Sequence, residues 1–169
     1  ALELLLSRHS QPRLQQPAPS GEVLSNIMQA ALRAPDHACL TPWQFIVCEG
    51  SGLDLLGEAF VASAAANGDD EATIDRAAKL PHRAPMVIVA ATKSTENAKV
   101  PWMEQVESTA CAVHAMQMAA YAQGFGGVWR TGSYAECDVV KSALGVEPED
   151  ELVGFLYLGT PLAERKPRP

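Results

Sequence analysis

The sequence predicts one compact domain in which helices and strands are mixed. Three observations support this prediction. The chain has 169 residues, of which 47% are hydrophobic, enough to build one core. Segments with the 3.6-residue period of helices alternate with short apolar runs that are typical of buried strands. No internal repeat or low-complexity linker divides the chain into parts.

The helices are predicted from the spacing of apolar residues and from the residues at their ends. Ser20 is a typical N-cap for the first long helix, and Pro35 is a typical stop. The longest helix has Pro101 at its first position and Gly124 at a left-handed C-terminal cap. Apolar residues line this helix nearly all round, so we expect it to be buried. The expected helices span residues 21–33, 53–66, 70–80, 101–123 and 135–145, after a short one that ends at Arg8.

Four apolar runs predict core strands. They are "WQFIVCE" from Trp43, "MVIVAAT" from Met86, "GVWRT" and "ELVGFLYLG". The glycines Gly124, Gly126 and Gly127 come after a helix and before a strand, whereas a dinucleotide-binding loop needs strand, glycines and helix in that order. We therefore expect Gly124 to cap the helix and the other two to form a tight turn.

Charge and composition exclude several classes of protein. The net charge of −7 and the pI near 5.0 argue against a nucleic-acid binder. No apolar run is long enough to span a bilayer, and the first residues lack the features of a signal peptide, so we expect a cytoplasmic protein. The four cysteines have no zinc-ligand spacing, and we expect them to be reduced and packed.

Polar residues gather just after several of the predicted elements. In "SRHSQPRL" the residues Arg8, His9 and Ser10 offer a guanidinium, an imidazole and a hydroxyl, which together match a phosphate or the polar edge of a heterocycle. A solvated helix end would have the same composition. The loop "RAPDHACLTPWQF" also fits a rigid turn capped by Asp36, and residues 129–131 fit a core Trp beside a surface Arg and Thr.

Taken together, these segments resemble the FMN-dependent nitroreductase family. The resemblance rests on four motifs in order: an N-terminal Arg-x-Ser, an "AP…PW.F" loop, an Ala-rich helix leading into "A.GFG..W", and a closing "LYLGTP". It covers almost the whole chain and is greatest to the small, minimal-length NAD(P)H nitroreductases. It implies an α+β fold with a mostly antiparallel sheet flanked by helices, and an intimate homodimer with FMN at the interface.

The resemblance also implies which residues bind the cofactors. Residues 8–10 and 129–131 hold the FMN phosphate and ribityl chain, and Arg33 and His37 reach in from the partner chain. The implied FMN contacts are Arg8, His9, Ser10, Arg33, His37, Trp129, Arg130 and Thr131. Residues 118–123 match a stretch near the nicotinamide cofactor. This region is Ala119, Ala120, Tyr121, Ala122, Gln123 and Gly124. Whether Arg165, Lys166 or Arg168 in the tail contacts the phosphate stays open.

The implied chemistry needs no catalytic side chain and no metal, because a flavin passes hydride through its own N5 atom. We interpret His114, on the longest helix, as a core residue. The implied activity is NAD(P)H oxidation with ping-pong transfer to electron-poor acceptors such as nitroaromatics or quinones. A non-catalytic flavin-binding sensor or carrier, and a cofactor-free interaction domain, stay open as alternatives.

Overall fold

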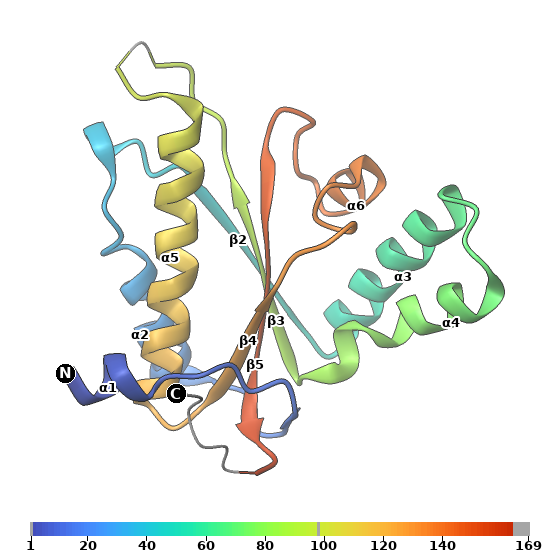
Figure 1. The fold of residues 1–169 in the computed structure, drawn as a ribbon, viewed down its shortest axis with the longest axis horizontal. Helices are drawn as coiled ribbons and strands as arrows, with labels where there is room; N and C mark the ends of the chain where they lie inside the picture. The colour runs from blue at the N-terminus through green and yellow to red at the C-terminus, as the bar shows by residue number, and fades with distance from the viewer. Residues whose placement is uncertain (1, 98, 164–169) are drawn as a thin grey trace.

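The computed structural model describes residues 2–97 and 99–163, and its centre is one antiparallel sheet (Figure 1). The order of the strands is β1-β5-β3-β2, with β4 also paired to β5. Every pairing is antiparallel. The strands are β1 (Leu14–Gln15), β2 (Trp43–Glu49), β3 (Met86–Thr92), β4 (Gly126–Arg130) and β5 (Glu151–Pro161). The four strands expected from the sequence are confirmed, and the short β1 was not predicted.

Helices cover both faces of the sheet (Figure 1). α2 and α5 lie on one face, and α3, α4 and α6 lie on the other. The helices are α1 (Leu2–Ser7), α2 (Gly21–Ala31), α3 (Ser51–Ala66), α4 (Glu71–Lys79), α5 (Trp102–Ala122) and α6 (Asp138–Ala143). Two short 3-10 turns are η1 (His37–Cys39) and η2 (Pro81–Arg83). The expected helices are confirmed within a few residues at their ends, and the predicted α+β architecture is confirmed with them.

The sequence of β3 is continuously apolar because this central strand is covered on both faces. Side chains alternate along a strand, so Met86 and Ile88 join the cluster under α2 and α5, while Val87 and Val89 join the cluster under α3. All seven residues of β3 are buried. The two layers of helices therefore pack on one shared sheet as a single domain.

Two of the three glycines near the start of β4 do not form the turn expected from the sequence. Gly124 has φ of 84° and caps α5 as predicted, but Gly126 and Gly127 lie inside β4, so the predicted turn is wrong there. The physical reason is close packing. A Cβ on Gly126 would lie 2.5 Å from Oε1 of Gln11 and 2.7 Å from Cδ2 of Leu14. Gly126 lacks a side chain because the N-terminal segment crosses the strand there, whereas a Cβ on Gly127 would lie 3.0 Å from Cδ2 of Leu158 in β5.

Helix α5 is not buried all round, contrary to the expectation from its composition. Glu107, Cys111 and His114 are exposed along one face, so the core position expected for His114 is wrong. Alanine presents too little apolar surface to determine which face is covered, and the large residues Val113 and Met116 determine it instead. Two of the four cysteines, Cys39 and Cys111, are exposed rather than packed, although all four are free thiols.

Candidate functional site

The N-terminal segment lies directly against β4 and brings two of the predicted motifs together. The backbone N–H of Gln11 donates to the carbonyl of Gly127 at 2.9 Å, and Leu14 pairs with Pro161 of β5. Residues 8–10 therefore precede a stretch of chain that is fixed along β4 and β5. Arg130, at the end of β4, lines the same cavity as Pro12 and Arg13.

Two cavities share this region. One, the N-terminal cavity, has a volume of about 530 Å³, and the other, the aromatic cavity, has a volume of about 510 Å³. Both volumes lie in the range of sites for small organic ligands. Arg83 and Arg130 line both cavities, so the two adjoin. The N-terminal cavity is also lined by Pro12, Arg13, Leu14 and Leu162.

The aromatic cavity lies on the side of the sheet covered by α3 and α4. It is lined by aromatic rings, by three arginines and by the loop that follows β4, which includes Thr131. This composition suits a planar ring that carries polar or anionic groups. The remaining lining residues are Phe60, Arg76, Leu80, Trp129, Gly132, Ser133, Tyr134, Phe155 and Tyr157.

The arginines around the two cavities are not paired with carboxylates. Among the described residues, the ion pairs within 4.0 Å join His37 to Glu104, His82 to Asp54, and Lys141 to Glu151. Four arginines thus surround adjoining cavities in a chain whose net charge is −7. Unpaired guanidinium groups gathered in this way attract and bind an anion.

Three buried nitrogens at the site have no hydrogen-bond partner in the part of the chain that the structure describes. They are Nη1 of Arg8, Nε2 of His9 and Nε of Arg130. A buried polar group without a partner is costly, so such groups commonly meet a ligand or water. Arg8 and His9 are only partly exposed. The burial of these atoms argues against a plain solvated helix end at residues 8–10.

The hydrogen bonding of His9 determines what its free nitrogen can do. Nδ1 lies 3.0 Å from the carbonyl oxygen of Ser7. A carbonyl only accepts, so Nδ1 carries the proton, and Nε2 of the neutral ring is an acceptor. A neutral His9 therefore suits a hydroxyl group of a ligand, whereas donation to a phosphate needs the imidazolium form. Ser10 is exposed beside it.

The three predicted residues at the end of β4 have different surroundings. The indole N–H of Trp129 donates to the carbonyl of Val153 at 3.1 Å, so this side chain braces the sheet. The guanidinium of Arg130 lies 5.8 Å from the ring centroid of Tyr157. Burial raises the pKa of Tyr157, while the charges of Arg130 and Arg83 oppose that rise. Thr131 is exposed and faces the aromatic cavity.

His37 lies far from residues 8–10, and Arg33 is exposed two residues after the end of α2. Nδ1 of His37 lies 2.8 Å from Oε2 of Glu104, in the first turn of α5. Tyr121, in the last turn, donates its hydroxyl to the carbonyl of Ser7 at 3.2 Å. These contacts place His37 and α1 at opposite ends of α5 (Figure 1). Seventeen residues of helix at 1.5 Å per residue separate them by about 25 Å.

The region predicted to lie near a nicotinamide cofactor connects α5 to its neighbours. Tyr121 also packs edge-on against His9, with ring centroids 6.0 Å apart. The Gln123 side chain donates to the carbonyls of Val23 and Ala119, and accepts from Asn26. Ala120 is fully buried, whereas Ala122 and Gly124 are exposed. Most of these contacts hold α1, α2 and α5 together.

Several residues of the two cavities were not singled out from the sequence. Arg83 is the last residue of the 3-10 turn η2 and comes just before the buried strand β3, and a cation in that position was the signal that could have identified it. Arg76 lies on α4, where an exposed arginine gives no signal. The cations Arg165, Lys166 and Arg168 lie outside the described residues.

Two kinds of feature are absent from residues 2–97 and 99–163. No group of three or more His, Cys, Asp and Glu side chains is placed to bind a metal ion. None of the helices in this part of the chain has the length and apolar character needed to cross a membrane.

The protein is an α+β domain whose two cavities have a composition that suits an anionic, aromatic ligand. Residues 5–160 match the model of the Nitroreductase family, and the chain belongs to this family. A protein of Escherichia coli strain K12 named "Putative NAD(P)H nitroreductase YdjA" is 52% identical over 161 residues, which cover 95% of this chain and 88% of the relative. A Haemophilus influenzae protein named "Putative NAD(P)H nitroreductase" is 40% identical, with 99% and 93% covered.

Solved structures support the same fold. A nitroreductase-like family protein from Bacillus cereus superposes with a TM-score of 0.83 at 20% identity, covering 99% of this chain and 88% of that one. An FMN-dependent nitroreductase from Clostridium difficile R20291 superposes with a TM-score of 0.72 at 20% identity, with 100% and 92% covered. The resemblance noted in the sequence is therefore confirmed at the level of family and fold.

Proposed function

We propose that the protein is an FMN-dependent oxidoreductase that takes hydride from NAD(P)H and passes electrons to electron-poor acceptors such as nitroaromatics or quinones. Membership of the nitroreductase family and the names of the relatives support this function. The structural observation that carries it is the pair of adjoining cavities that share Arg83 and Arg130. One cavity is cationic, and the other is aromatic as well as cationic.

The residues present fit FMN, which joins a planar ring to a phosphate through a hydroxylated chain. Arg8 and Arg130 each have a buried nitrogen without a partner, as a phosphate or carbonyl oxygen would require. Neutral His9 offers an acceptor to a hydroxyl group. Thr131 and the aromatic cavity offer a place for the ring. This assignment of residues is part of the proposal.

The chain's own contribution is binding, orientation and charge. Bound FMN supplies the hydride chemistry through its ring, without help from a nucleophile or metal. Arg83 and Arg130 supply positive charge to both cavities, and Arg13 supplies it to the N-terminal cavity. Arg8 adds a cation in the segment just before that cavity's lining residues. Trp129, held by its bond to Val153, keeps the end of β4 rigid, so that Thr131 is presented in a fixed place.

A homodimer with shared sites is the second part of this proposal. Arg33 and His37 are expected FMN contacts, yet His37 is paired with the opposite end of α5 from residues 8–10. In a two-fold symmetric dimer, a contact between this chain's Arg8 and the partner's His37 is repeated between this chain's His37 and the partner's Arg8. The exposed face of α5, with Glu107, Cys111 and His114, leaves surface available for such a partner.

The experiment that tests the function starts from the absorption spectrum of the purified protein. FMN should be present, and it should be released on denaturation at about one per chain, because a largely preformed site retains its cofactor. Steady-state NAD(P)H oxidation with an added quinone then separates an enzyme from a flavin-binding sensor or carrier. Colourless protein that cannot be reconstituted with FMN would exclude both. A cytoplasmic location remains part of the proposal.

A further inference from the structure

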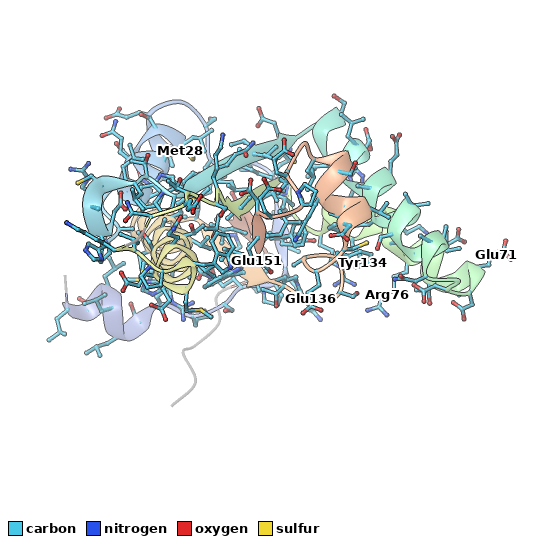
Figure 2. All side chains as sticks on the ribbon, turned by 90° about the horizontal axis from the view of Figure 1, so that it is seen from above. Met28, Glu71, Arg76, Tyr134, Glu136 and Glu151 are labelled. Atoms are coloured by element: carbon cyan, nitrogen blue, oxygen red, sulfur yellow. The ribbon has the colours of Figure 1, made fainter. Side chains whose placement is uncertain are left out.

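We call Arg76 and Tyr134 the open edge of the aromatic cavity, because Arg76 is exposed and Tyr134 is only partly buried. Arg76 lies on α4, Tyr134 lies in the loop after β4, and both line the cavity. Figure 2 labels both residues and shows them near one another. The Tyr134 ring stacks on Phe60 with centroids 4.3 Å apart and planes at 19°. Phe60 is only 1% exposed, so the phenol is held on a rigid base.

Both groups are hydrogen-bond donors, and neither side chain has a hydrogen-bond or ion-pair partner within residues 2–97 and 99–163. Burial raises the pKa of Tyr134, Asp69 adds to that rise, and Arg76 opposes it. The phenol therefore stays protonated at neutral pH and can donate. Among the described residues, no carboxylate oxygen lies within 4.0 Å of the Arg76 guanidinium. A guanidinium and a phenolic O–H on one edge match the oxygens of a carboxylate or phosphate.

The position of Arg76 suits a substrate better than a resident cofactor. Arg83 and Arg130 line both cavities, and Arg8 and Arg130 have the buried, unpartnered nitrogens. Arg76, in contrast, is exposed and lines the aromatic cavity only. A cofactor that stays bound is enclosed, whereas a substrate enters from solvent. A substrate that reacts near Thr131 occupies the same cavity, so its outer end meets the open edge.

We propose that Arg76 and Tyr134 form an anion-binding subsite that recognises a negatively charged group on a substrate of the enzyme. This inference rests on the proposed function. Two substrates could present such a group: an acceptor with a carboxylate, or the nicotinamide donor with the additional phosphate that distinguishes NADPH from NADH. In either case, the subsite gives the enzyme a preference for the charged member of a substrate pair.

The test measures that preference in FMN-loaded protein. One arm compares kcat/KM for NADPH and NADH with a neutral quinone as acceptor. The other compares 4-nitrobenzoate with its neutral methyl ester, using one fixed donor. We compare the wild type with Arg76→Gln, with Tyr134→Phe and with Lys79→Gln. Lys79 is exposed on α4 and does not line the cavity, so its change removes the same charge from the same helix.

In Arg76→Gln the charged-over-neutral ratio should fall roughly tenfold in one arm, the scale of a hydrogen bond between charged groups. Tyr134→Phe should lower it less, and Lys79→Gln should leave it as in the wild type. The arm that responds identifies the source of the anion. A second readout needs no turnover: binding of 4-nitrobenzoate to the oxidised holoenzyme, followed by the flavin absorbance, should weaken in Arg76→Gln if the acceptor arm responds.

Two results would overturn the inference. If the charged-over-neutral ratio of kcat/KM is equal in Arg76→Gln and the wild type in both arms, the open edge does not recognise the charge of the substrate. A rise in the FMN dissociation constant of Arg76→Gln apoprotein, measured by flavin fluorescence, would assign Arg76 to the cofactor instead. Failure of the wild-type chain to bind FMN would overturn the proposed function itself and this inference with it. That failure is distinguishable, because it occurs before any variant is compared.

Discussion

The backbone N–H of Gln11 donates to the carbonyl of Gly127 at 2.9 Å, and this bond joins the two halves of the candidate cofactor site. The side-chain amide of Gln117 donates to the same carbonyl at 3.1 Å. Thus α5, β4 and the N-terminal segment meet at one backbone oxygen. The close approach depends on the absence of a side chain at Gly126.

The first prediction is that Gly126→Ala destabilises the protein by about 1–3 kcal/mol, the usual cost of overpacking. The added Cβ would lie 2.5 Å from Oε1 of Gln11 and 2.7 Å from Cδ2 of Leu14. Urea denaturation measures the loss. Gly52→Ala is the matched control, since its Cβ would meet nothing closer than 3.7 Å in a helix. Equal stability of Gly126→Ala and the wild type would contradict the account of β4.

Gly126 also shows which parts of the fold could be predicted from the sequence. The periodicity of apolar residues predicted the long helices and the buried strands, because burial controls those patterns. It could not predict that Gly126 and Gly127 lie within a strand, because the close neighbours, Gln11 at Gly126 and Leu158 at Gly127, are far away in the sequence. The exposed face of α5 was missed for a related reason, since alanines such as Ala115 fit either a core or a surface.

The candidate site was predictable only in part. Residues 8–10 and 129–131 could be proposed from motifs, since each follows directly on a recognisable element. Arg83 could be noticed only as a cation just before a buried strand. Arg76 gave no signal, because α4 reaches the cavity through its packing on α3 and η2. Tyr134 depends likewise on its stacking with Phe60, which lies 74 residues earlier in the chain.

The second prediction is that Arg8→Ala weakens FMN binding by about 1.5–3 kcal/mol, the scale of a hydrogen bond to a charged group. The reason is the buried Nη1 of Arg8, which has no hydrogen-bond partner between residues 2 and 163, residue 98 aside. Flavin fluorescence titration of the apoprotein measures the dissociation constant. Lys79→Ala removes a cation that lines neither cavity, and it should leave the dissociation constant unchanged. An unaltered FMN dissociation constant in Arg8→Ala would favour the alternative interpretation of residues 8–10 as a solvated helix end.

The third prediction concerns the N-cap of α4, the helix that positions Arg76. Hydrogen bonds from the side chain and then the backbone N–H of Thr73 lower the pKa of Asp70. The folded-state pKa is then below the unfolded value of about 3.9. The cap therefore stabilises the fold above that pH, and its contribution is lost as the pH falls through the folded-state pKa.

Asp70→Ala should accordingly unfold at lower urea concentration than the wild type at neutral pH, and the difference should vanish in acid below the folded-state pKa. Asp70→Asn separates the cap from the charge, because an Asn side chain also accepts from the helix N-terminus. It should keep most of the stability and lose the pH dependence. A difference between Asp70→Ala and the wild type that persists unchanged in acid would contradict the role of the carboxylate.

The last prediction is that each FMN site takes Arg8 from one chain and His37 from its partner. Within one chain, His37 is bound to Glu104 in the first turn of α5, while the last turn contacts α1, about 25 Å away. Arg8→Ala and His37→Ala should each inactivate their own homodimer. A heterodimer of the two holds one doubly damaged site and one intact site. Random exchange makes half of the dimers heterodimers, so roughly a quarter of wild-type activity should return.

The control mixes Arg8→Ala with a chain that carries both changes, because no combination of these two chains has an intact site. That mixture should stay inactive, and its inactivity excludes recovery by refolding or by free FMN. Subunit exchange is followed by native mass spectrometry, with one chain labelled by mass, and circular dichroism checks that both single variants are folded. If exchanged, folded heterodimers of Arg8→Ala and His37→Ala stay as inactive as the control, the sites are not shared, and His37 must serve its own chain.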